Sequence, residues 1–121
     1  MGMLMNRNGR DVDCMLDREN ETLWYDGAEI SLRPKLFAVL DYLVMHPNRL
    51  LTRRELLSNV WSDVYVSPEI IKTYVRDLRK LLHDDPRAPC YIETRHGRGY
   101  RFIGSIEIKS AAKNESASCY F

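Results

Sequence analysis

The chain has 121 residues, of which 45% are hydrophobic and 29% are charged, and its formal net charge is +1. This length fits one domain with its own core, and the composition is that of a soluble globular protein rather than a disordered one. No apolar run approaches the ~18–20 residues that cross a bilayer, and the start "MGMLMNRNGR" lacks the apolar core of a secretory signal, so we expect a cytoplasmic location.

The first third of the chain predicts a small antiparallel sheet. Residues 1–10 are expected to be a flexible leader. From Asp11 to Leu32, short strands alternate with turns. "TLWY" and "AEISL" alternate apolar and polar residues, and they are joined by Asp26-Gly27, a strong signal for a two-residue hairpin.

From Arg33 the apolar residues recur at helical spacing. "RPKLFAVLDYLVMHP" predicts a first helix that stops at Pro47. "NRLL" is expected to be a short link. "TRRELLSNVW" predicts a second helix, because Thr52 and Glu55 have the spacing of a capping box.

The third predicted helix is strongly two-sided. Ser67 is expected to cap it and Pro68 to open it, and "PEIIKTYVRDLRKLL" carries it to about Leu82. At helical spacing, one line of apolar residues is expected to be buried: Ile71, Val75, Leu78 and Leu82. The basic residues share another face of the helix: Lys72, Arg76, Arg79 and Lys80.

A basic hairpin follows that helix. "YIET" and "YRFIG" are predicted strands on either side of "RHGRG". Gly97 and Gly99 are interpreted as residues that permit positive φ in a tight turn, since a phosphate-binding loop would need a following helix and a Lys-Ser/Thr pair. Residues 105–121 are interpreted as a polar tail, or as a linker within a longer, membrane-anchored protein of which this is the cytoplasmic part, with "IEIK" extending a strand.

Charge is distributed unevenly along the chain. Residues 1–30 hold three basic and seven acidic groups, a net −4, whereas residues 68–101 hold eight basic and five acidic groups, a net +3. A basic half on a near-neutral protein is typical of nucleic-acid binding, although such runs are also common on solvated faces.

Cofactor and enzyme motifs are not found in the sequence. Cys14, Cys90 and Cys119 are widely spaced without a CxxC pair, which favours reduced thiols over a zinc site. No metalloprotease, nucleophile-elbow or paired-acid motif is present, so we expect neither a cofactor nor a small-molecule substrate and predict that the protein is not an enzyme.

The order sheet, helix, helix, helix, hairpin indicates a function. A helix with one basic face has the width to enter a DNA major groove. A basic hairpin directly after it would lie beside that helix and could reach phosphates or the minor groove, where narrow width attracts arginine. The two features therefore support one another.

Four segments, "LRPKLFAVLDYLV", "RLLTRRELLSNVW", "IIKTYVRDLRKLL" and "YIETRHGRGYRF", resemble successive parts of the OmpR/PhoB-type winged-helix DNA-binding domain. The wording of "LRPKLFAVLDYLV" and "DDPRAPCYIET" leans toward the CadC- or ToxR-like branch, which has no receiver domain. The resemblance implies an α+β fold over residues 11–104: an N-terminal antiparallel sheet of four strands, three helices in a winged helix-turn-helix, and a C-terminal wing.

The resemblance also implies roles for individual residues. Lys72, Thr73 and Arg76 match positions that face base edges, and Tyr74 and Arg79 match phosphate contacts. Glu69 and Asp77 stand where the family often has basic residues. The predicted DNA-binding set, wing and shared basic face included, is Lys72, Thr73, Tyr74, Arg76, Arg79, Lys80, Thr94, Arg95, His96 and Arg98.

The wing holds one open question. His96 stands where the family often has the arginine that enters the minor groove, and Arg95 and Arg98 on either side could take over that contact.

The resemblance also implies protein partners. Trp61–Val66 corresponds to the loop that touches RNA polymerase in activators of this family, and paired operator sites would suit a homodimer on DNA.

Two rival functions stay open at this level. A winged helix that binds protein and not DNA is favoured modestly by Glu69 and Asp77. A small enzyme has no motif in its favour.

Overall fold

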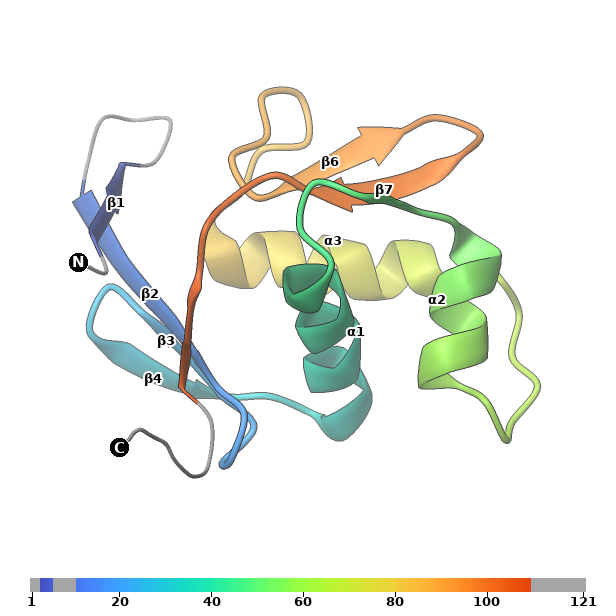
Figure 1. Cartoon of the computed structure of the whole chain (residues 1–121), viewed down its shortest axis with the longest axis horizontal. Coiled ribbons are helices and arrows are strands. Elements are labelled where there is room, and N and C mark those ends of the chain that lie inside the picture. Colours follow the sequence, from blue (N-terminus) through green and yellow to red (C-terminus); the bar gives the residue numbers. More distant parts are fainter. Residues whose placement is uncertain (1–2, 6–10, 110–121) are drawn as a thin grey trace. The chain divides into compact units, whose positions relative to one another are not determined.

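The computed structural model describes residues 3–5 and 11–109. It divides into two compact units, one formed by the chain up to Pro34 together with the chain from Ile106, and the other formed by Lys35–Ser105. Figure 1 shows the elements of both.

The first unit is a five-stranded sheet. Four strands are antiparallel neighbours in chain order: β1 (Met3–Met5), β2 (Asp11–Asp17), β3 (Thr22–Tyr25) and β4 (Ala28–Ser31). Asp26 and Gly27 have φ angles of 52° and 84°, so both central residues of the β3–β4 turn have the positive φ of a type I′ hairpin. The predicted hairpin is confirmed.

Two strands of this sheet lie in segments expected to be leader and tail. β1 pairs with the first half of β2, and β8 (Glu107–Lys109) pairs in parallel with Met15–Asp17 in its second half. β8 lies within "IEIK", which the sequence predicted to extend a strand, whereas β1 was not predicted, because its three residues are too few to show an alternating pattern. Residues 1–2, 6–10 and 110–121 of those segments, Cys119 among them, lie outside the described residues.

The second unit contains the helices and the hairpin. Its helices are α1 (Pro34–Met45), α2 (Arg53–Val60) and α3 (Ile70–Leu82). Its sheet has the strand order β5-β7-β6, formed by β5 (Leu50–Leu51), β6 (Ile92–Arg95) and β7 (Gly99–Phe102). The predicted α+β winged-helix architecture is confirmed, with β5 replacing the expected plain link between α1 and α2.

A shared apolar core holds this unit together. All four residues of the predicted line on α3 are buried, and so are Trp61, Tyr100 and Phe102. The other large contributors come from both preceding helices and the sheet: Leu36, Val39, Leu40, Leu43, Leu51, Leu56, Val60 and Ile92. The burial explains the helical period, because each helix turns one stripe inward.

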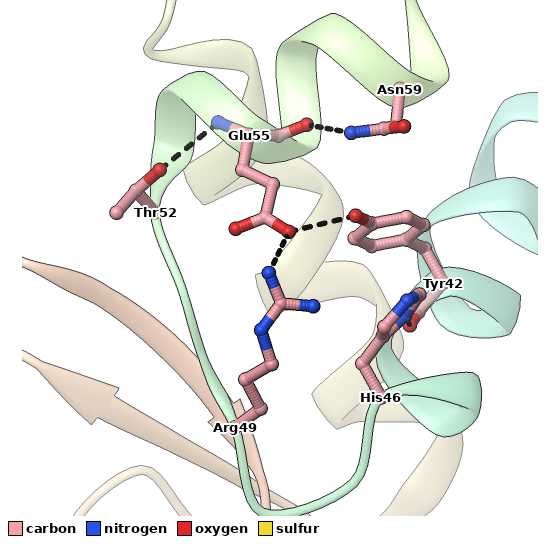
Figure 2. Close-up of polar contacts among 6 residues, drawn as sticks. All are labelled: Tyr42, His46, Arg49, Thr52, Glu55 and Asn59. Atoms are coloured by element: carbon pink, nitrogen blue, oxygen red, sulfur yellow. Dashed lines mark hydrogen bonds and ion pairs between the residues drawn. The ribbon is translucent and has the colours of Figure 1, made fainter.

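A polar cluster connects α1 with α2 (Figure 2). The Glu55 carboxylate accepts hydrogen bonds from Tyr42 Oη at 2.8 Å and from Arg49 Nη2 at 2.7 Å. The bond to Glu55 and burial raise the pKa of Tyr42 above 10.0. Thr52 Oγ1 accepts a hydrogen bond from Glu55 N at 3.1 Å, which is one of the two bonds of the predicted capping box. The Glu55 carboxylate bonds to Tyr42 and Arg49. The start of α2 is thereby fixed.

α3 begins at Ile70 with Glu69 as its N-cap, so the predicted cap at Ser67 and start at Pro68 are wrong. Ile70, Ile71 and Lys72 donate to the carbonyls of Ser67, Pro68 and Glu69, which are bonds to the third residue before rather than the fourth. Residues 67–69 are therefore a tight turn that leads into the helix. The helix ends at His83, whose φ of 55° and ψ of 44° place it in the left-handed region.

Candidate nucleic-acid interface

One face of α3 is available to a ligand. Lys72, Thr73, Arg76 and Lys80 are exposed, while the opposite face is buried. In the part of the chain that the structure describes, no carboxylate forms an ion pair with Arg76. The predicted major-groove residues thus share one solvent-facing surface.

A basic groove joins this helix to the hairpin. It has a volume of about 230 Å³ and is lined by Arg53, Lys72, Thr94, Arg95, His96, Gly97, Arg98, Gly99 and Tyr100. Four of these residues are cationic and none is acidic. Because the cations come from α2, α3 and the wing, the groove concentrates positive potential suited to a phosphate backbone.

Two glycines shape the wing. Arg98 N donates to Arg95 O at 2.9 Å, and Gly97 in the turn between them has a φ of 75°. Gly99 has a φ of 152°, and a Cβ atom there would overlap the Leu51 carbonyl oxygen of β5. Gly97 therefore turns the hairpin and Gly99 lets it approach β5, as expected for turn glycines rather than a phosphate-binding loop.

Two residues predicted to contact phosphates bond to each other within the domain. Arg79 Nη2 donates to Thr94 Oγ1 at 2.6 Å and to Ile92 O at 2.9 Å, and Arg79 is half-buried. These bonds tie the last turn of α3 to β6. Contact of either residue with phosphate stays a prediction.

The wing is also fixed from its base. The Asp84 carboxylate, 8% exposed, accepts hydrogen bonds from Cys90 N at 2.6 Å, Ile92 N at 2.9 Å and Tyr91 N at 3.3 Å. Asp84 thereby sets the start of β6 relative to the end of α3.

Tyr74 is another predicted phosphate contact that packs within the domain. Its ring meets the buried Trp61 edge-on, with centroids 5.1 Å apart at 82°, and Tyr74 is half-buried. Lys35 Nζ lies 5.9 Å from the centroid of the Trp61 ring and donates to Val60 O at 2.6 Å. Tyr74 thus helps to hold the end of α2 against α3.

The predictions from sequence missed Arg53. It is the first residue of α2, directly after the cap Thr52, and it lines the basic groove. A usable signal was present, because the helix before a recognition helix crosses the DNA backbone and a cation at its start would lie near phosphates.

Beside the interface, the α2–α3 loop exposes apolar groups. Tyr65 is 92% exposed and Val64 is 57% exposed. A second hollow of about 370 Å³ there is lined by Arg54, Leu57, Ser58, Trp61, Ser62, Val64, Tyr65, Val66 and Pro68. Large apolar groups at such exposure are typical of surfaces that contact another protein.

The described residues contain no group of three or more His, Cys, Asp or Glu side chains placed to hold a metal ion. Cys14 and Cys90 are free thiols. Within the same residues, no helix is both long and apolar enough to span a membrane.

A recognition helix, a preceding helix and a basic wing together define the chain as a winged-helix domain of the OmpR/PhoB type. Residues 27–102 match the family described as "Transcriptional regulatory protein, C terminal", and the chain belongs to this family. The family recognised from the sequence is confirmed.

Relatives come from more than one kind of regulator. The chain is 38% identical over 78 residues to the transcriptional regulatory protein KdpE of Mycobacterium tuberculosis, covering 64% of this chain and 34% of KdpE. It is 34% identical over 91 residues to the transcriptional activator CadC of Escherichia coli, covering 74% of this chain and 18% of CadC. The chain thus spans about a third or less of these curated relatives.

A solved structure gives the same fold. The Klebsiella pneumoniae RstA DNA-binding domain, in complex with the RstA box, superposes with a TM-score of 0.66 at 26% identity, covering 74% of this chain and 90% of that one.

Proposed function

We propose that this domain binds double-stranded DNA in a sequence-specific way as part of a bacterial transcription regulator. The observation that carries the proposal is the basic groove, in which Lys72 of α3, Arg53 of α2 and Arg95 and Arg98 of the wing converge. The family, and the DNA complex of a related domain, support the same function.

The proposed mechanism divides the surface by task. Lys72, Thr73 and Arg76 contact base edges from α3 in the major groove. Arg53 and Lys80 lie against phosphates. Arg79, Tyr74 and Thr94 contact phosphates through the atoms that their bonds within the domain leave exposed. The wing places Arg95, His96 and Arg98 at the adjacent minor groove.

Within the wing, Arg98 is the better candidate for the minor groove. Arg95 Nη1 lies 4.0 Å from Glu93 Oε1, whereas among the described residues no carboxylate pairs with Arg98. We infer that Arg98, at the turn beside Gly97, takes the contact that His96 leaves open.

Binding of the whole chain to duplexes selected from a random pool tests the proposal. Arg98→Ala should weaken binding and reduce the slope of log K against log salt by about 0.9 for each phosphate that the variant no longer neutralises. Arg87→Ala is the matched control, because Arg87 is exposed in the α3–β6 loop and lines neither hollow. An Arg98→Ala slope equal to that of the control contradicts the wing assignment.

The rival protein-binding function makes a different prediction for the same titration. It predicts no retention of any duplex, even at low salt. The four groove cations argue against it, because a polyanion gains from each one it neutralises.

Two partners remain proposals on this surface. The exposed Val64 and Tyr65 support contact of the Trp61–Val66 loop with RNA polymerase. Paired operator half-sites about one helical turn apart would accommodate two copies of the domain. A cytoplasmic location follows from both proposals.

A further inference from the structure

Glu69 occupies an unusual place for an acidic residue. It directly precedes Ile70, the first residue of α3, and its side chain is 67% exposed. In a helix-turn-helix, the N-terminal residues of the recognition helix contact base edges. Glu69 therefore stands at a position where its side chain would meet the floor of the major groove.

Two cations of the basic groove flank its carboxylate. Lys72 Nζ lies 3.3 Å from Glu69 Oε1, and Arg53 Nη1 lies 3.9 Å from Glu69 Oε2. The three groups together carry one net positive charge. An isolated carboxylate would be repelled by the phosphates, but this one approaches DNA as part of a cationic group.

We propose that Glu69 determines sequence specificity by accepting a hydrogen bond from the amino group of a cytosine. The inference rests on the proposed function and adds a base preference to it. A carboxylate is acceptor-only, and the amino groups of cytosine and adenine are the donors in the major groove. Guanine and thymine present oxygen or nitrogen acceptors at their own edges, which a carboxylate repels.

Cytosine is favoured over adenine on the same grounds. Adenine places its N7 acceptor beside the N6 amino group, so a carboxylate that reaches N6 also meets a lone pair. Cytosine has no such acceptor next to N4. A glutamine would have the opposite preference, because its amide can donate to N7 and accept from N6 together.

The experiment uses the whole chain and duplexes selected from a random pool. The unsubstituted chain should enrich sequences with a fixed cytosine at one position. Glu69→Gln should lose that preference and gain one for adenine at the same position, a change of roughly 5- to 140-fold in relative affinity for the two duplexes.

Asp77→Asn is the matched control. It removes one negative charge from α3, the helix that Glu69 precedes, at a residue that is half-buried. Any general gain in affinity from lower negative charge should appear in both variants, and only Glu69→Gln should change the preferred base. Near-ultraviolet circular dichroism of each variant checks that the fold is retained.

The outcomes separate this inference from the function beneath it. If the unsubstituted chain enriches no sequence, the proposed function fails and this inference fails with it. If it enriches a sequence and Glu69→Gln keeps the same base at every position, only the role of Glu69 is overturned.

Discussion

The base and the tip of the wing use arginine in opposite ways. At the base, Arg79 donates to Ile92 O and Thr94 Oγ1, and Arg101 Nη2 lies 2.6 Å from Glu93 Oε1. At the tip, Arg98 is exposed and pairs with no carboxylate of the described residues, and the 49% exposed Arg95 lies 4.0 Å from Glu93 Oε1. The same residue type is therefore part of the structure in one region and available to a ligand in the other.

The difference shows how to judge a cation proposed to bind DNA. A guanidinium that already bonds to buried backbone must give up those bonds, or share them, before it contacts phosphate. Arg79 also has a buried Nε without a hydrogen-bond partner among the described residues, so its place is set by the bonds of Nη2. Exposure and existing partners decide the role, and residue type alone does not.

The largest expected loss of stability is at the base of the wing. Asp84→Ala removes the acceptor of three backbone N–H groups near the start of β6 and should lower the free energy of unfolding by about 3–5 kcal/mol. Urea unfolding followed by tryptophan fluorescence measures this loss.

Its control is the neighbouring acid. Asp85 Oδ1 accepts a hydrogen bond from Arg87 N at 3.0 Å in an exposed loop, so Asp85→Ala should cost only about 1 kcal/mol. Equal losses for the two variants would mean that the wing is not anchored through Asp84.

The second test compares the two wing glycines. Gly99→Ala adds a Cβ atom that overlaps Leu51 O at a φ of 152° and should cost about 3 kcal/mol, because strain and overlap combine. Gly97→Ala has nothing within 4 Å and only the strain of its φ of 75°, so about 1 kcal/mol is expected.

Thermal unfolding of both variants measures the two losses of stability. Equal losses would contradict the close approach of β7 to β5. They would not contradict the turn at Gly97, because that residue lies at the tip of the wing.

The sequence was enough to predict the elements that show a period. The apolar line from Ile71 to Leu82 and the Asp26-Gly27 turn are local patterns, and both are present in the structure. β5 could not be predicted in this way, because it is two residues long and forms by pairing with β7. A period shows which face is buried, but it does not show which distant segment covers that face.

The same limit applies to the candidate site. The exposure of Lys72 and Arg76 follows from the helical period, so their place on the open face was predictable. The bond between Arg79 and Thr94 joins residues fifteen positions apart, and the entry of Arg53 into the groove joins separate helices. Contacts of this kind depend on tertiary packing, which no single stretch of sequence encodes.

The last test compares Arg79 with Arg76, an exposed arginine of the same helix. Arg79→Ala should lower the free energy of unfolding by about 2 kcal/mol, because Thr94 and the Ile92 carbonyl lose a charged donor in a half-buried site. Arg76→Ala, one turn earlier and exposed, should change it by less than about 0.5 kcal/mol. Arg76→Ala should instead reduce discrimination at one base pair by about 1–3 kcal/mol, measured as the affinity ratio for cognate and singly substituted duplexes. Thr94→Val, which keeps the shape of the side chain and removes its acceptor, should reproduce part of the Arg79→Ala loss. If Arg76→Ala lowers the affinity for cognate and scrambled duplexes by the same factor, Arg76 contacts the DNA backbone and not a base. If Arg79→Ala leaves stability unchanged, the bonds of Arg79 to Ile92 and Thr94 do not stabilise the base of the wing.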